Sequence, residues 1–264
     1  MSTSAEPACA IGAYVNGLDN LTDFQTRIGK QLAVVLWYVP WPEPFPRTEA
    51  ERVAGNGSVP LITWEPWREA SDDYVRAFLT AAKDFGRPLL LRFAHEMNGD
   101  WYPWAGDPVG FKKRWSYIYN VKRELRADNV ALVFCPNHYD KTAAALEEYY
   151  PGDALVDWVG LDGYNWGEGK WETFDVIFRA GYDRLTALTA KPLMIGEFAS
   201  AERGGDKAAW ITDAFTKLQT VYPRVKLFCW FNINKERDWR VNSSPESQAA
   251  LKSALQNAYF SSKM

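Results

Sequence analysis

The chain has 264 residues and 47% of them are hydrophobic, so it can bury one substantial core and is not an intrinsically disordered chain. Its formal net charge is −3, with 30 basic and 33 acidic residues mixed along the sequence. Because no basic block or stripe is present, we expect no nucleic acid and no membrane among its partners, and a neutral ligand fits better.

Short apolar runs recur along the chain, with helical patterns between them. The runs are nearly continuous in hydrophobicity, which is typical of parallel strands that are buried on both faces. They predict eight strands, at residues 11–17, 31–41, 59–67, 87–97, 129–137, 157–166, 191–200 and 225–232.

Helix start and stop signals lie between these runs. Ser71 precedes an acidic first turn, and Gly86 ends the same helical pattern. Asp107 and Pro108 form a favourable N-cap and first-turn pair, and Ser244 opens the last helix in the same way.

Strands that alternate with helices in this way predict an α/β fold, namely a single (β/α)8 TIM barrel, which commonly has about 250 residues. An open parallel sheet would share the alternation. We expect one domain over residues 1–264, in which residues 1–10 form a flexible N-terminal segment.

Aromatic residues are unusually frequent, with 13 Trp, 13 Tyr and 14 Phe making up 15% of the chain. Most Phe and many Tyr side chains are expected in the core. So many Trp side chains are harder to place there, because each large ring needs room and its N–H needs a partner. A flat ring with one polar edge suits the C–H face of a sugar, so the Trp content favours a carbohydrate-binding cleft.

Cysteine and histidine are scarce. Cys9, Cys135 and Cys229 do not make a disulfide framework, and the last two lie within apolar strand-like runs. His95 and His138 are too few for a His-rich metal site, so we expect neither a metal nor an organic cofactor.

In a (β/α)8 barrel the active site lies at the C-terminal ends of the strands, where the βα loops begin. Polar and aromatic residues are concentrated at those ends. They are Tyr14, Asn16, Trp37, Trp41, Trp64, Trp67, His95, Glu96, Asn137, His138, Tyr164, Trp166, Glu197, Trp230 and Asn232. This concentration predicts a functional cleft at one end of the barrel.

Two glutamates carry the chemistry in this interpretation. Glu96 ends the fourth strand run and Glu197 ends the seventh, so both can face one cleft across the barrel mouth. Glycoside hydrolysis needs such a pair, with one carboxyl protonated and the other ionised. A lone glutamate there would more often be a strand-end ion pair or a solvated loop residue. Glu65 and Asp162 are rival carboxylates, and Asp162 could orient a neighbour.

Three segments carry a family resemblance. Residues 92–104 read RFAHEMNGDWYPW, residues 158–166 read WVGLDGYNW, and residues 195–199 read IGEFA. Together they resemble glycoside hydrolase family 26, which contains β-mannanases and a smaller group of β-1,3-1,4-glucanases, or lichenases. The resemblance extends over at least five of the eight strand ends.

The resemblance implies roles for individual residues. Glu96 resembles the acid/base of the family and Glu197 its nucleophile. His95 resembles the histidine that contacts substrate at the cleavage point, and Tyr164 the tyrosine that hydrogen-bonds the nucleophile. Arg92 is added as a supporting catalytic residue, because it belongs to the same motif as Glu96.

A further set is expected to bind substrate. Trp101 resembles a stacking residue of a sugar subsite, and the other members follow from their place at the barrel end. The set comprises Trp101, Trp230, Trp37, Trp64, Trp67, Trp104, Trp166 and Asn137. Loop packing is the alternative for Trp37, Trp41, Trp64 and Trp67. In the Trp37–Trp41 pair and in the Trp64–Trp67 pair, one ring could face substrate while the other packs.

We therefore predict a retaining endo-β-glycanase that cleaves internal linkages of a plant-type β-glycan by double displacement. Many mannanases of the family carry Trp-Phe-Trp-Trp where this chain has Trp101-Tyr102-Pro103-Trp104, so mixed-linkage β-1,3-1,4-glucan is favoured over mannan or glucomannan. An endo-β-1,4-mannanase is the main alternative. A non-catalytic glycan-binding barrel is a further alternative, but it should lose one carboxylate and both are present. A barrel that acts on phosphorylated substrates would need a glycine-rich phosphate-binding loop after strand seven or eight, and the Gly204-Gly205 pair is too short for one.

The substrate class also predicts the setting in which the protein acts. We expect a polysaccharide or oligosaccharide as its partner, a monomeric state and secretion from the cell. The first ten residues lack the hydrophobic stretch of a signal peptide, so we expect such a leader to be absent from this sequence.

Overall fold

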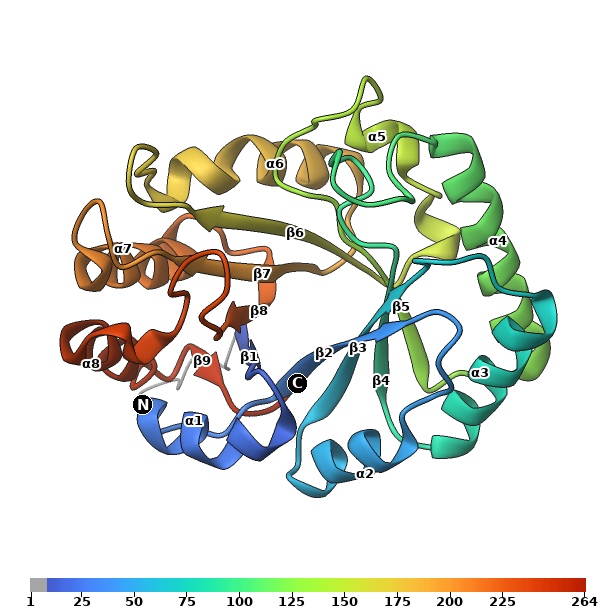
Figure 1. Cartoon of the computed structure of the whole chain (residues 1–264), viewed down its shortest axis with the longest axis horizontal. Helices are drawn as coiled ribbons and strands as arrows, with labels where there is room; N and C mark the ends of the chain where they lie inside the picture. The colour runs from blue at the N-terminus through green and yellow to red at the C-terminus, as the bar shows by residue number, and fades with distance from the viewer. Residues whose placement is uncertain (1–8) are drawn as a thin grey trace, which may run out of the picture.

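Eight parallel strands close into a barrel in the computed structural model, which describes residues 9–264 (Figure 1). Neighbouring strands follow in order from β2 to β8 and then β1, and β1 also pairs with β2, so the ring closes. The predicted TIM barrel is confirmed and the open sheet is wrong. The strands are β1 (Cys9–Tyr14), β2 (Val34–Pro40), β3 (Val59–Glu65), β4 (Leu89–Phe93), β5 (Val130–Phe134), β6 (Trp158–Asn165), β7 (Leu193–Ser200) and β8 (Val225–Phe231).

Helices cover the outside of the barrel (Figure 1). They are α1 (Leu21–Ile28), α2 (Arg47–Gly55), α3 (Asp72–Phe85), α4 (Pro108–Leu125), α5 (Leu146–Tyr149), α6 (Phe174–Leu188), α7 (Lys207–Thr220) and α8 (Pro245–Ala254). Short 3-10 turns lie at Leu18–Asn20, Asp153–Leu155 and Val241–Ser243. Among the described residues, no helix combines the length and apolar character that a membrane crossing requires.

The residues predicted to begin and end helices do so in the structure. The Ser71 hydroxyl accepts from the Tyr74 amide at the start of α3, and Gly86 ends that helix in the left-handed conformation with a φ of 71°. The Asp107 carboxylate accepts from the Gly110 amide, directly before the proline that begins α4.

Hydrophobic side chains form two layers on either side of the strands. Leu36, Leu61 and Leu90 belong to the cluster inside the barrel. Their neighbours along the strands, such as Ile62 and Leu91, belong to the larger cluster between the strands and the helices. Because successive strand residues alternate in this way, only every second residue near a strand end can face the barrel mouth.

The expected flexible segment at residues 1–10 needs a correction at its end. Cys9 and Ala10 belong to β1 and are buried, because they pair with Phe260 and Ser261 of the short strand β9 (Phe260–Ser261). Residues 1–8 lie outside the described residues. The C-terminal strand thus extends the sheet beside the start of β1.

Gly12 in β1 supplies a test of this packing. A Cβ atom there would lie 2.6 Å from Cys229 Sγ and 2.7 Å from the Phe228 carbonyl oxygen on β8. We expect Gly12→Ala to lower the free energy of unfolding by about 1–3 kcal/mol, measured by urea denaturation. Gly55→Ala is the matched control, because a Cβ atom there meets nothing within 4 Å, and its stability should be unchanged or slightly higher. Equal stabilities of the two variants would contradict this account.

Candidate active site

Strand β4 ends in an unusual backbone conformation that places two predicted site residues. Ala94 has a φ of 48° and Glu96 a φ of 53°, values that non-glycine residues rarely adopt. The chain is held there by two strand-end hydrogen bonds, from the Ala94 amide to the Trp64 carbonyl and from the Glu96 amide to the Cys135 carbonyl. The predicted strand at residues 87–97 therefore stops at Phe93, and the turn beyond it carries His95 and Glu96 at the mouth.

Arg92 lies fully buried inside the barrel and joins three other strands. Its guanidinium group donates to Thr63 Oγ1 at 2.7 and 2.9 Å and to both carboxylate oxygens of Asp162 at 2.8 and 3.0 Å. It also donates to Glu197 Oε1. A buried charge is tolerated only when it is paired and hydrogen-bonded, and Arg92 meets that condition with two carboxylates.

A β-bulge at Gly196 turns Glu197 toward this group. Ile195 pairs with Leu161 on β6, whereas Glu197 pairs with Asp162, so Gly196 is the extra residue in β7. The pairing with β8 skips at the same place. A Cβ atom on Gly196 would lie 2.5 Å from Asp162 Oδ1, so only glycine fits against the ion pairs.

Glu197 is stabilised in its ionised form. The hydroxyl of Tyr38 donates to Oε1 at 2.6 Å, and that of Tyr164 donates to Oε2 at 2.5 Å, which is the contact expected for Tyr164. Burial alone would raise the pKa of Glu197, but the Arg92 charge and the two hydroxyls outweigh it and hold the pKa at about 2. The carboxylate is therefore charged at neutral pH.

Glu96 is also buried, but its partners are neutral. Asn137 Nδ2 donates to Oε1 at 2.9 Å and Trp101 Nε1 donates to Oε2 at 2.7 Å. Burial first, and the negative charge of Glu197 second, raise the pKa of Glu96 to about 7. The two glutamates thus differ in protonation near neutral pH, although both lie in one buried group.

His95 is neutral and lies close to Glu197. Burial and the nearby Arg92 charge lower the pKa of His95 to about 3. Its Nε2 lies 3.1 Å from the Tyr102 hydroxyl and 3.9 Å from Glu197 Oε1. The indole N–H of Trp104 donates to the His95 carbonyl at 2.8 Å, which fixes the backbone at the turn.

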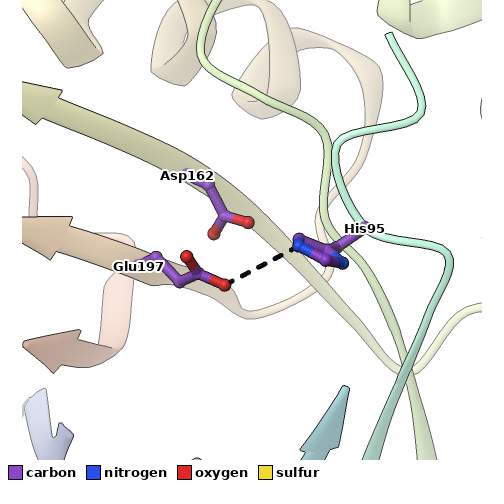
Figure 2. A group of neighbouring side chains, drawn as sticks. All are labelled: His95, Asp162 and Glu197. Atoms are coloured by element: carbon purple, nitrogen blue, oxygen red, sulfur yellow. Dashed lines mark ion pairs between the residues drawn. The ribbon is translucent and has the colours of Figure 1, made fainter. Parts of the chain in front are cut away.

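His95, Asp162 and Glu197 have the geometry of a possible metal group, because their ligand atoms all lie within 4.8 Å of one another. Figure 2 shows the three side chains turned toward one another, with Glu197 directed at the His95 ring. The Arg92 guanidinium, however, donates to both carboxylates of this group. A cation is therefore already supplied by the chain, and a metal ion here would be repelled by it.

Aromatic side chains lie next to the two glutamates, where Trp101 contacts Glu96 and Trp166 packs beside Tyr164, the partner of Glu197. We call them the aromatic rim, which comprises Trp67, Trp101, Tyr102, Trp104 and Trp166. Trp67, Trp101 and Trp166 are the most exposed of its rings, at 45%, 40% and 37%. Trp104 is half-buried and stacks on Tyr102 with ring centres 4.4 Å apart. Exposed indole rings beside buried carboxyls form a surface suited to stacking against sugar rings.

Three of the predicted substrate-binding tryptophans do not face this site. Trp64 and Trp230 are fully buried on the outer face of their strands, where they pack against Phe78 and Phe198. Trp37 also has the outward position on β2, and it lines a separate hollow of about 340 Å³ formed with α2 and the loop after β1. The expectation for Trp64 and Trp230 is wrong, because side chains alternate along a strand and these two rings are buried. Substrate binding by Trp37 stays a prediction.

The inward neighbours of these tryptophans are functional residues that the residue pattern alone did not indicate. Tyr38 follows Trp37 and contacts Glu197, and Phe231 follows Trp230 and packs at 5.6 Å against the Tyr164 ring. Tyr102, which bonds His95, was noted only as a departure from a motif. The signal that would have found Tyr38 and Phe231 is the period of two along each strand, counted from a residue known to point inward.

The rival carboxylates and His138 also have defined places. Asp162 is paired with Arg92, so it orients a neighbour as expected. Glu65 accepts from the Trp67 indole at 3.0 Å and supports the rim. His138 is largely buried, and burial lowers its pKa to about 4; it packs against Phe178 on the helix side.

Arg92→Met tests whether the guanidinium group is what permits two buried carboxylates. We expect the free energy of unfolding at pH 7 to fall by about 3–5 kcal/mol, because an unpaired buried charge remains. Burial already raises the pKa of Asp162 in the native protein, and the Arg92 charge partly opposes that shift. Without Arg92, the pKa of Glu197 also rises above its unfolded value and that of Asp162 rises further, so the folded variant binds protons more tightly than the unfolded chain. The loss should therefore shrink as the pH falls to 4.5. Urea unfolding of both proteins at the two pH values measures this, and a penalty independent of pH would contradict it.

Comparison with known proteins gives the family of the chain. The family model described as Glycosyl hydrolase family 26 matches residues 70–255. The chain is 38% identical over 276 residues to Endoglucanase H of Acetivibrio thermocellus, which covers 93% of this chain and 30% of that protein. It is 28% identical over 197 residues to a mannan endo-1,4-beta-mannosidase of Bacillus subtilis, covering 70% of this chain and 48% of that protein. The chain thus spans less than half the length of these curated relatives.

Solved structures agree at the level of the fold. The GH26 β-mannanase of Bacteroides ovatus superposes with a TM-score of 0.70 at 14% identity, covering 97% of this chain and 90% of that chain. A Bacillus subtilis mannanase superposes with a TM-score of 0.69 at 19% identity, covering 97% and 87%. Since the family model covers more than half of the sequence on a matching barrel, this chain belongs to glycosyl hydrolase family 26.

Proposed function

We propose that this chain is a retaining endo-β-glycanase in which Glu96 is the acid/base and Glu197 the nucleophile. The observation that carries the proposal is the contrast between the partners of two buried carboxyls. Glu197 is held by the Arg92 guanidinium and two tyrosine hydroxyls, whereas Glu96 accepts from the neutral side chains of Asn137 and Trp101. In keeping with this contrast, the pKa of Glu197 lies at about 2 and burial raises that of Glu96 to about 7. Two carboxyls whose environments separate their pKa values in this way are suited to act as acid and nucleophile.

In the proposed reaction, Glu197 attacks the anomeric carbon while Glu96 gives its proton to the departing glycosidic oxygen. The Glu197 carboxylate becomes an ester, and its negative charge no longer raises the pKa of Glu96. Glu96 can then act as a base and take a proton from water, which attacks the same carbon and releases Glu197. Two inversions give net retention of configuration.

The surrounding residues have roles consistent with this cycle. Tyr38 and Tyr164 hold the two oxygens of Glu197, and Arg92 keeps it ionised. Asn137 fixes the Glu96 carboxyl within the rim. We expect neutral His95 to contact a sugar hydroxyl. The presence of both carboxyls also argues against a glycan-binding barrel without catalysis.

For the substrate, we propose mixed-linkage β-1,3-1,4-glucan, with mannan as the second candidate. The relative named Endoglucanase H aligns with more of this chain and at higher identity than the relative named mannan endo-1,4-beta-mannosidase. A β-1,3-xylanase of Vibrio sp., 32% identical over 123 residues, covers 46% of this chain and 25% of that protein. The Tyr102 hydroxyl at His95 adds a polar group that a phenylalanine in the mannanase-like motif would lack. Because the substrate is a polymer, we also propose that the protein acts outside the cell.

The acid role of Glu96 has a pH signature. Because glycosylation needs the protonated carboxyl, kcat/KM on polysaccharide should fall as the pH rises above about 7, the pKa of Glu96. Glu96→Ala should lower polysaccharide turnover by roughly 10²- to 10⁴-fold. It should lower the glycosylation rate of an aryl glycoside with a good leaving group far less, measured by stopped-flow release of the phenol.

Two control variants frame this experiment. Glu197→Ala should abolish turnover of both substrates in a folded protein, because the nucleophile is needed whatever the leaving group. Glu65→Ala removes a carboxyl of the rim and should leave the alkaline limb of the pH profile in place. Equal losses on both substrates in Glu96→Ala would count against its acid role.

The substrate assignment is tested by reducing-sugar release from barley β-glucan, lichenan, glucomannan and galactomannan, measured side by side. We expect the first two to be cleaved fastest. Tyr102→Phe should reduce the preference for glucan over mannan by about 10-fold, since a lost hydrogen bond is worth about 1–1.5 kcal/mol. Faster cleavage of galactomannan by the wild type would overturn the glucan assignment while leaving the glycanase proposal intact.

A further inference from the structure

Lys207 is a buried lysine outside the catalytic group. It is the first residue of α7, its side chain is fully buried, and burial lowers its pKa to about 8, so it remains charged at neutral pH. A buried ammonium group is unfavourable unless polar groups surround it, so its partners indicate what the charge holds. Those partners lie chiefly in residues 232–244 between β8 and α8, which we call the β8–α8 loop.

The ammonium group of Lys207 donates three hydrogen bonds to this loop. Nζ donates to the carbonyl oxygens of Asp238 at 3.1 Å and Arg240 at 2.7 Å, and to Ser243 Oγ at 2.8 Å. Glu202, in the loop before α7, lies 3.8 Å from Nζ and accepts from the Ser243 hydroxyl. The charge of Lys207 therefore connects the start of α7 with the backbone of the β8–α8 loop.

The same loop supports the aromatic side of the proposed active site. Trp239 is buried, and its ring lies 5.0 Å from the ring of Tyr164 and 5.2 Å from that of Trp166. The indole of Trp230 donates to the Trp239 carbonyl at 3.1 Å. The buried Trp230 ring therefore supports the loop. The Tyr164 hydroxyl donates to Glu197. Movement of the loop would displace the surface against which Tyr164 packs.

We propose that Lys207 is a positioning residue for the nucleophile. Its ammonium group holds the β8–α8 loop, Trp239 of that loop holds the ring of Tyr164, and Tyr164 holds Glu197 in the orientation for attack. The inference rests on the proposed function, because it takes Glu197 as the nucleophile. Lys207 itself does not touch the reacting atoms.

Lys207→Met tests the proposal, because it keeps much of the buried side-chain volume and removes the three donated hydrogen bonds. Cleavage by trypsin after Arg240, within the loop, should become at least about 10-fold faster as local opening becomes easier. Trapping of Glu197 by an activated 2-deoxy-2-fluoro aryl glycoside forms the ester to the anomeric carbon and expels the phenolate. Its rate per folded molecule, followed by mass spectrometry, should fall by about 10- to 100-fold.

Three further variants separate positioning from general destabilisation. Lys226→Met removes an exposed lysine of β8 whose ammonium group donates to the Pro223 carbonyl, and it should change neither measurement. Lys207→Arg keeps the charge and should recover part of the trapping rate. Ser243→Ala removes one partner of the ammonium group and should give smaller changes in the same direction, which keeps the test available if Lys207→Met does not fold.

The two measurements fail in different ways. Loss of protection from trypsin with an unchanged trapping rate would overturn the positioning role of Lys207. Unchanged protection in a folded Lys207→Met variant would overturn its hold on the loop. Absence of trapping in the wild type would instead count against the proposed function, and the trypsin measurement would still decide whether Lys207 secures the loop.

Discussion

The buried guanidinium group of Arg92 is the interaction on which the rest of the active-site end depends. Its single positive charge pairs with both Asp162 and Glu197 inside the barrel, where little water can solvate them. Among residues 9–264 no cation pairs with Glu96, which accepts hydrogen bonds from the neutral side chains of Asn137 and Trp101. The unequal protonation of the two glutamates follows from this unequal distribution of one charge, because both groups are equally removed from solvent.

Local backbone features adapt the barrel to this charge. The bulge at Gly196 leaves room for the ion pairs and turns Glu197 toward the mouth. Left-handed backbone conformations at Ala94 and Glu96 follow the end of β4 at Phe93. A regular strand could not direct these side chains in the same way, since its residues alternate strictly. The hydrophobic layers on both sides of the strands offset the cost of such irregular positions.

The tryptophans mark the limit of reasoning from residue type. Trp64 and Trp230 lie at strand ends, as predicted, yet they pack against helices because they occupy the outward positions. Tyr38, which follows Trp37 on β2, and Phe231, which follows Trp230 on β8, have the inward positions at the mouth. The rim tryptophans Trp67, Trp101 and Trp166 follow the strands in loops, where no alternation applies, and their rings are exposed.

The sequence by itself determined the barrel, its helix caps and the pair of strand-end glutamates, because these depend on local patterns of hydrophobicity, on turn residues and on short motifs. Tertiary structure alone decided which strand face each side chain occupies and which partners each carboxyl has. Arg92 and Glu197, for example, are 105 residues apart in the chain. Their contact, and the pKa values that depend on it, arise only when the closed barrel excludes water and brings distant strands to one mouth.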